Sequence, residues 1–170
     1  GAVWEAEQDR PHRRVALKVL AGWNAFSPRM RARLQREAEM ASRLDHPGIC
    51  TVYEMGELEG APFVAMQYVE GETLAAILAK QKALSEAAES APQISGAEVA
   101  SKGRESHSGP TTRGAIPVIL GMIEQVARAL EVAHEAGLIH RDIKPGNIIV
   151  RPEGEAVIVD FGLARPLEDE

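Results

Sequence analysis

The chain has 170 residues, of which 45% are hydrophobic and 26% are charged, with a net charge of −6 at pH 7. These values are typical of a globular chain large enough to bury a core, and the negative charge argues against general nucleic-acid binding. The chain contains no run of about 18 apolar residues, so we expect no membrane segment within it. Its one cysteine, Cys50, cannot form an internal disulfide, which indicates a reducing compartment. Cys50 lies in a strand-like run, so we expect its thiol to be buried.

The first part of the chain predicts a small antiparallel sheet with one helix. Residues 2–8 and 13–20 alternate as two strands joined by a polar turn, and two further strands are expected at 50–55 and 62–68. Between these pairs, residues 29–44 have an apolar stripe at helical spacing. Ser27 is the expected N-cap of this helix, with Pro28 at its first position.

The middle of the chain predicts two helices separated by an insertion. The first helix runs from Leu74 to about Lys82, and the second runs from Pro117 to Ala136. Residues 84–116 are rich in Ser, Gly, Thr and Pro and contain no aromatic residue, so they are interpreted as a low-complexity insertion. We expect Ile119 and Ile123 on the second helix to be left exposed.

The last part of the chain predicts a β-hairpin that gathers polar residues. Residues 148–150 and 156–159 are short strand-like runs joined by a Pro-Glu-Gly turn. A polar loop precedes this hairpin and Asp-Phe-Gly follows it, so Asp142, Asn147 and Asp160 should lie at one end of a small sheet. Two carboxylates and an amide suit Mg²⁺, which prefers oxygen ligands and often shares them with phosphates.

This stretch resembles the protein kinase family. His-Arg-Asp at 140–142 with Asn147 fits the H-R-D-x-x-x-x-N catalytic loop, and Asp-Phe-Gly at 160–162 fits D-F-G. The resemblance implies that Asp142 is the base that orients the substrate hydroxyl. It also implies that Asn147 and Asp160 hold the magnesium ions that bridge the nucleotide phosphates.

The same resemblance assigns roles to two further basic residues of the loop. Lys144, two residues after Asp142, corresponds to the lysine with which serine/threonine kinases contact the transferred phosphate. Arg141 corresponds to the arginine that grips a phosphorylated activation loop.

The first half of the chain also carries family motifs. Val-Ala-Leu-Lys at 15–18 is similar to the V-A-I-K strand, which implies that Lys18 clamps the α- and β-phosphates. Glu37, nineteen residues later, is implied as the ion-pair partner of Lys18. Glu39 is the alternative, but it points about 160° away around the helix.

The nucleotide-binding residues follow from the same alignment. Gly1 and Val3 match the end of the G-x-G-x-x-G-x-V loop. Met66 is expected at the back of the adenine pocket, and residues 67–69 form the hinge. In the hinge, the backbone groups of Gln67 and Val69 would hydrogen-bond the adenine edge. The complete set expected to contact the nucleotide is Gly1, Val3, Ala16, Lys18, Met66, Gln67, Val69, Ile149 and Asp160.

The resemblance implies an α+β, two-lobed protein-kinase-like fold, present in part. Residues 1–69 would form a small antiparallel β-sheet lobe with one helix, ending in the hinge, and residues 70–83 the first helix of the second lobe. After the insertion at 84–116, residues 117–170 would begin a mainly helical lobe with the catalytic loop and DFG. We expect a chain truncated at both ends, inactive alone, and most like the bacterial kinases of eukaryotic type.

The implied activity is that of a cytoplasmic serine/threonine protein kinase in signalling. It would transfer the γ-phosphate of Mg·ATP to Ser or Thr hydroxyls of protein substrates, and a missing C-terminal part could anchor it to a membrane. One alternative is a pseudokinase or nucleotide-binding scaffold, although such proteins usually lose Lys18, Asp142 or Asp160. A small-molecule kinase is less favoured, because its relatives usually lack Arg-Asp-x-Lys together with D-F-G.

Overall fold

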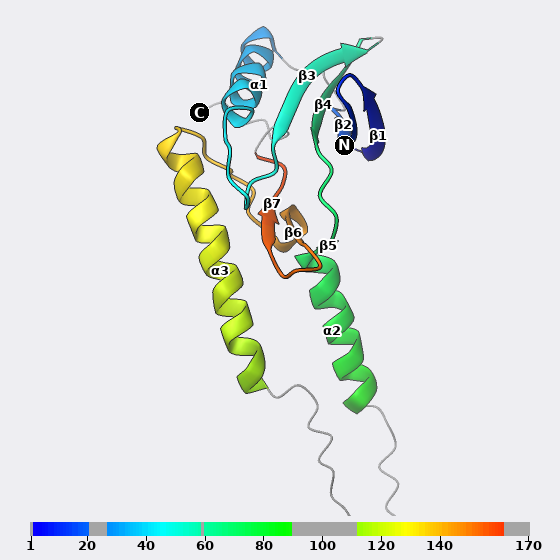
Figure 1. Ribbon diagram of the computed structural model, residues 1–170, viewed down its shortest axis with the longest axis vertical. Coiled ribbons are helices and arrows are strands. Elements are labelled where there is room, and N and C mark those ends of the chain that lie inside the picture. Colours follow the sequence, from blue (N-terminus) through cyan, green and yellow to red (C-terminus); the bar gives the residue numbers. More distant parts are fainter. Residues whose placement is uncertain (1, 21–26, 59, 90–111, 162–170) are drawn as a thin grey trace, which may run out of the picture.

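The computed structural model describes residues 2–20, 27–58, 60–89 and 112–161. Figure 1 shows a curved sheet and one helix at one end, and two long helices extending from the other end. The sheet is antiparallel with strand order β1-β2-β4-β3. Its strands are β1 (Val3–Asp9), β2 (His12–Val19), β3 (Val52–Leu58) and β4 (Ala61–Gln67). The four strands predicted from the sequence are therefore confirmed, with small shifts at their ends.

Helix α1 (Pro28–Ala41) begins where the sequence predicts and ends earlier. The Ser27 hydroxyl accepts a hydrogen bond from the Met30 N–H at 3.2 Å, which confirms the predicted N-cap. Beyond Ala41 the backbone bonds shorten to three-residue spacing, from Arg43 N–H to Met40 and from Leu44 N–H to Ala41. The chain thus leaves the helix through a tightened turn, and residues 42–44 lie outside the α-helix.

Helices α2 (Leu74–Glu89) and α3 (Thr112–Glu135) are both longer than predicted. The predicted insertion at 84–116 is therefore wrong at both ends, and its middle, residues 90–111, lies outside the described part of the chain. Residues 83–89 consist mostly of Ala, Leu and Glu, whose high helix propensity continues α2. Helix α3 begins before Pro117, which lies inside the helix and removes one backbone donor from it.

A second, three-stranded sheet carries the predicted hairpin. Its strand order is β5-β6-β7, with β5 (Glu72–Thr73), β6 (Ile148–Val150) and β7 (Ala156–Ile158). A 3₁₀ turn, η2 (Pro145–Asn147), leads directly into β6. Ile49 bridges Ile158 in parallel, and the Cys50 N–H donates to the Ile158 carbonyl at 2.9 Å. These bonds tie the segment between α1 and β3 to the second sheet.

One hydrophobic core joins both sheets and α3. Val64 of β4, Ala133 of α3 and Ile158 of β7 have no exposed surface, and Ile49 is 1% exposed. Because all of them belong to one packed cluster, the two sheets are held in a defined relative position. The same packing fixes the residues at the ends of β2 and β7 relative to one another.

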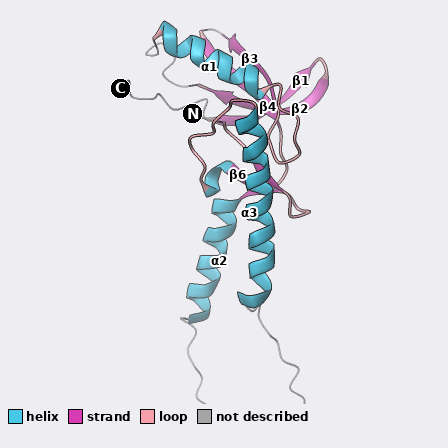
Figure 2. Cartoon of the chain, turned by 90° about the vertical axis from the view of Figure 1, so that its left-hand side faces the viewer, coloured by secondary structure: helices cyan, strands magenta, loops and turns pink. Residues whose placement is uncertain are grey.

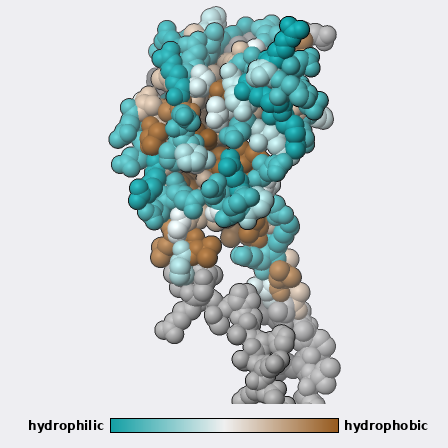
Figure 3. All heavy atoms as spheres, viewed as in Figure 1, coloured by the Kyte–Doolittle hydropathy of each residue, from teal (hydrophilic) through white to brown (hydrophobic). Residues whose placement is uncertain are grey.

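The far ends of the long helices expose apolar side chains. Ile119 is 54% exposed and Ile123 is 58% exposed, which confirms the expectation for both. Helices α2 and α3 run side by side in both views, with a groove of ≈ 840 Å³ between them that is lined mostly by apolar residues (Figures 1 and 2). Hydrophobic side chains gather at this end of the molecule (Figure 3). No helix among the described residues is long and apolar enough to cross a membrane.

We predict that Gly71→Ala destabilises the fold. Gly71 has φ +145°, and an added Cβ would lie 2.3 Å from the backbone oxygen of Val150, so β5 and β6 would have to separate. We expect a loss of about 1–3 kcal/mol in the free energy of unfolding, measured by chemical denaturation. The control is Gly121→Ala on α3, where no atom lies within 4 Å of the added Cβ. That change should stabilise the helix by up to about 1 kcal/mol. Equal stability of the two variants would contradict this account of Gly71.

We also predict that Cys50 is unreactive in the folded protein. Cys50 is 3% exposed and lies two residues before β3. Burial raises the pKa of its thiol to about 12, so the reactive thiolate is scarce at neutral pH. Iodoacetamide at pH 8 should leave the native protein unlabelled and should label the urea-unfolded protein fully. Rapid native labelling would show that the thiol is accessible.

Candidate functional site

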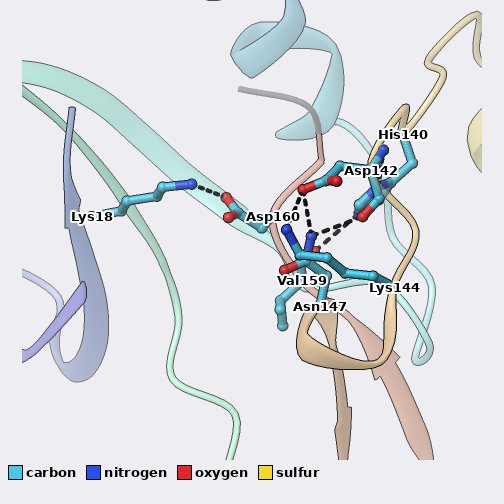
Figure 4. A network of polar contacts seen from close by, with 7 residues as sticks. All are labelled: Lys18, His140, Asp142, Lys144, Asn147, Val159 and Asp160. Carbon is cyan, nitrogen blue, oxygen red and sulfur yellow. Dashed lines mark hydrogen bonds and ion pairs between the residues drawn. The ribbon is translucent and has the colours of Figure 1, made fainter. Parts of the chain in front are cut away.

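The catalytic-loop residues predicted from the sequence lie together between α3 and β6. The Asn147 amide donates to the Asp142 backbone carbonyl at 2.8 Å and to its carboxylate oxygen Oδ2 at 3.2 Å. The Lys144 ammonium donates to the same Oδ2 at 2.7 Å (Figure 4). The expected proximity of Asp142 and Asn147 is therefore confirmed, and Lys144 joins them.

His140 ties this loop to the segment that carries Asp160. Its ring is 1% exposed, and its Nε2 lies 3.0 Å from the Val159 carbonyl oxygen. Burial lowers the pKa of His140 below its usual value, which favours the neutral ring. A neutral ring protonated at Nε2 donates to Val159 and accepts the Asp142 N–H at Nδ1, 3.3 Å away. The ring also packs 4.8 Å from the ring of Phe161.

Two residues of the site have left-handed backbone conformations. Arg141 has φ 61° and Asp160 has φ 70°, and neither is a glycine. Each such residue costs of the order of 1 kcal/mol, and surrounding contacts must hold it in place. Both are site residues predicted from the sequence, so the backbone strain occurs at positions whose side chains need a defined orientation in the site.

Lys18 and Asp160 meet across the two sheets. Lys18 lies on β2, and its side chain is 4% exposed. Its ammonium forms an ion pair with the carboxylate of Asp160, which follows β7 (Figure 4). The residue expected to clamp phosphates and the residue expected to bind a metal ion are therefore brought into direct contact.

Glu37 has partners other than the one predicted. It is buried while Glu39 is exposed, so the helix phase inferred for α1 is confirmed. Its Oε1 accepts from Arg33 at 3.0 Å and from Arg141 at 2.7 Å. In this arrangement of the described residues Lys18 pairs with Asp160 instead, so the Lys18–Glu37 ion pair expected in the active arrangement stays a prediction. Each buried charge must have a counter-ion, and in this arrangement Asp160 and the two guanidinium groups serve as those counter-ions.

Arg33 was missed by the sequence analysis. Its spacing of four residues from Glu37 could have indicated the contact, because residues four apart are neighbours on a helix surface. The contact between Glu37 and Arg141 spans 104 positions, and no local pattern could have indicated it.

Several residues predicted to bind the nucleotide share one face of the larger sheet. Val3 pairs with Lys18 across β1 and β2, and Ala16 pairs with Met66 across β2 and β4. Directly opposed residues point to the same face, as do residues two apart on a strand. Val3 is 58% exposed and Met66 is 7% exposed, so this face runs from the surface into the core. Gly1 and Gly162 lie outside the described residues.

The hinge residues are partly engaged already. The Gln67 backbone N–H donates to the Thr51 carbonyl at 2.8 Å, so this N–H is not available to a ligand. The backbone carbonyl of Gln67 has two lone pairs and could still accept a hydrogen bond from a ligand. Val69 is 8% exposed, and Ile149 is partly buried against the common core on the side of the second sheet. Their roles in nucleotide binding remain predictions.

Another cluster at the hinge was not predicted. Arg14 on β2 forms ion pairs with Glu5 at 2.8 Å and with Glu70 at 3.1 Å, and its guanidinium lies 4.2 Å from the ring centre of Tyr68. These side chains are about half exposed, so solvent screens the pairs and each contributes little stability. The cluster connects β1 and β2 to the segment just after the hinge.

The oxygen donors of the site fit a magnesium ion that is shared with phosphates. Asp160 offers a carboxylate, and Asn147 offers its amide oxygen, since its nitrogen faces Asp142. Among the described residues, no three His, Cys, Asp or Glu side chains form a closed metal site. A small protein ligand set is what Mg²⁺ accepts, because it usually keeps waters and binds phosphate oxygens as well.

Comparison with known proteins assigns the family. A family model for the protein kinase domain matches residues 1–170. The serine/threonine-protein kinase PknA of Mycobacterium tuberculosis is 36% identical over 173 residues, covering 99% of this chain and 33% of PknA. PknD of the same species is 36% identical over 169 residues, covering 99% of this chain and 21% of PknD. The chain thus spans a third or less of these curated relatives.

Solved structures give the same assignment for the fold. The crystal structure of the M. tuberculosis PknI kinase domain matches with a TM-score of 0.70 and 29% sequence identity. The match covers 97% of this chain and 56% of that domain. The predicted fold class, a partial two-lobed arrangement with an antiparallel sheet and helices, is therefore confirmed.

We predict that His140 makes the fold sensitive to acid. Its pKa is lowered in the folded state, so the unfolded chain binds a proton first as the pH falls below about 6.5. The stability that depends on neutral His140 is complete above that pH and is lost below it. In His140→Gln, which can still donate to Val159, the difference in melting temperature between pH 7.5 and pH 5.5 should be smaller. Identical pH dependence in both proteins would contradict the role assigned to the buried ring.

Proposed function

The chain belongs to the protein kinase family, and we propose that it transfers the γ-phosphoryl group of ATP to serine or threonine hydroxyls of proteins, in signalling. The observation that carries the proposal is the cluster in which Lys144 and Asn147 hold Asp142 next to the segment bearing Asp160. The same proposal places the protein in the cytoplasm, where ATP and Mg²⁺ are available.

Asp142 acts as the base for the incoming hydroxyl. The serine or threonine oxygen forms a bond to the γ-phosphorus, and the bond from that phosphorus to the bridging oxygen of ADP breaks. The hydroxyl proton passes to the Asp142 carboxylate, whose Oδ2 is fixed by two hydrogen bonds from Lys144 and Asn147. A fixed carboxylate orients the hydroxyl in line with the leaving group, which is most of what this reaction requires.

Lys144 supplies positive charge beside the transferred group. Its ammonium lies 2.7 Å from Asp142, so it neutralises that carboxylate in the absence of substrate. A phosphoryl group that approaches Asp142 brings negative charge to the same place. The Lys144 ammonium can then donate a hydrogen bond to the phosphoryl oxygens as well. Its half-exposed side chain leaves room for that motion.

Lys18, Asn147 and Asp160 hold the nucleotide phosphates. Lys18 contacts phosphate oxygens from the sheet side, while Asn147 and Asp160 provide oxygen ligands for Mg²⁺ from the side of the second sheet. Magnesium held by these two residues would supply positive charge against the negative charge that develops during transfer. The proposed phosphate site therefore lies where Lys18 of the larger sheet meets Asp160 after the smaller sheet.

We predict that Asp142→Asn and Asp160→Ala fail in different ways in the complete gene product. Asp142→Asn removes the base, so transfer to a generic Ser/Thr peptide should fall about 100-fold or more while binding of Mg·ATP is retained. Asp160→Ala removes a metal ligand, so Mg-dependent binding and transfer should fall together. Transfer is followed with labelled ATP and binding by calorimetry, with the exposed Glu39→Gln as the matched control.

Three results would contradict the proposal. Near-normal turnover in Asp142→Asn would show that this carboxylate is not the base. Binding of Mg·ATP by the wild-type protein without transfer to any protein or small molecule would identify a nucleotide-binding scaffold instead. Transfer to a small-molecule hydroxyl and not to peptides would identify a small-molecule kinase.

A further inference from the structure

The segment that leads from the larger sheet to α2 is fixed at both of its ends. At one end, the Gln67 N–H donates to the Thr51 carbonyl at 2.8 Å. At the other end, Gly71 lies so close to the Val150 backbone that an added Cβ would be 2.3 Å from its oxygen. Residues 68–70 run between these two points. They include Val69, whose backbone is expected to meet the adenine edge.

One side chain contacts both neighbours of Val69. The Arg14 guanidinium donates to the Glu70 carboxylate at 3.1 Å and lies 4.2 Å from the ring centre of Tyr68. The same guanidinium forms an ion pair with Glu5 of β1 at 2.8 Å. Val69 itself is 8% exposed and belongs to the common core. The segment is therefore held by the core through Val69 and by β1 and β2 through Arg14.

We infer that Arg14 is a positioning residue for the adenine base. With Glu5, Tyr68 and Glu70 it forms a hinge clasp, which fixes the hinge backbone relative to β2. Arg14 lies two residues before Ala16, so both side chains are on the face of β2 that is expected to cover the base. The inference rests on the proposed function and deepens it, because it names what holds the adenine end of the same site.

The contacts of the hinge clasp are individually weak, but they act on the same short segment. The side chains of Arg14, Glu5 and Glu70 are 47%, 53% and 69% exposed, so solvent screens their ion pairs. A hinge that is loose in the free protein must be ordered when the nucleotide binds, and this ordering lowers the affinity. The clasp orders the hinge beforehand. Its loss should weaken nucleotide binding and leave transfer from the bound nucleotide unchanged.

The first test compares Arg14→Gln with the wild type in the complete gene product. The dissociation constant for Mg and a non-hydrolysable ATP analogue, measured by calorimetry, should rise about fivefold, which corresponds to about 1 kcal/mol. The rate of transfer to a generic Ser/Thr peptide at saturating ATP should stay within about twofold of the wild-type rate. A variant that is merely less stable would lose both quantities or neither.

Arg13→Gln is the matched control. Arg13 is the neighbouring arginine on β2, and its guanidinium also lies on a tyrosine ring, 3.3 Å from the ring centre of Tyr53. Its hydrogen bond goes to the Gln8 side chain at 2.7 Å, on β1. Because these contacts are made to β1 and β3 and not to residues 68–70, Arg13→Gln should change the nucleotide affinity by less than about twofold.

A second background separates positioning from direct contact with the nucleotide. In Tyr68→Leu combined with Glu70→Gln, Arg14 has lost both of its hinge partners. Adding Arg14→Gln to this background should leave the affinity unchanged, because no clasp remains to be removed. If Arg14→Gln weakens binding by the same factor in both backgrounds, Arg14 touches the nucleotide itself and the positioning role is wrong.

Hydrogen exchange tests the clasp without nucleotide. The amides of residues 68–70 should exchange faster in Arg14→Gln than in the wild type, while those of β6 stay unchanged. The inference is overturned if exchange at 68–70 is unaltered, or if the affinity of Arg14→Gln stays within about twofold of the wild type. Either result leaves the kinase proposal intact. If the wild type binds no Mg·ATP, the proposed function fails and the adenine-positioning role fails with it, whatever the exchange shows.

Discussion

The site depends on one physical requirement, that the buried charge of Lys18 be matched by an anion. Lys18 lies inside the larger sheet, and its counter-ion, Asp160, follows the last strand of the smaller sheet. The pair can form only because one core, including Ile49, Val64 and Ile158, holds the two sheets together. Packing of apolar side chains thus sets the distance at which the functional charges meet.

The catalytic loop depends on the same core through His140. Its buried neutral ring joins the backbone of Asp142 to the carbonyl of Val159, the residue before Asp160. A loop of polar residues would otherwise have little to fix it, because loops expose their backbone to water. The histidine instead makes the positions of Asp142 and Asp160 depend on each other.

The buried charges of the site are matched in two separate sets. Lys18 pairs with Asp160, while Glu37 accepts from Arg33 and Arg141. Because a buried charge needs a counter-ion, each set holds together elements that are distant in the sequence.

The sequence alone determined the local features of this protein. The alternation of β1 and β2, the Ser27 cap of α1, the hairpin of β6 and β7 and the proximity of Asp142 to Asn147 all follow from neighbouring residues, and all were found. The length of α2 is also a local feature, since residues 83–89 have high helix propensity although their composition is typical of a low-complexity segment. The tertiary structure decided that Lys18 pairs with Asp160 and that Glu37 pairs with Arg141. A charge selects its partner by distance and burial in the folded chain, and motif spacing does not encode either quantity.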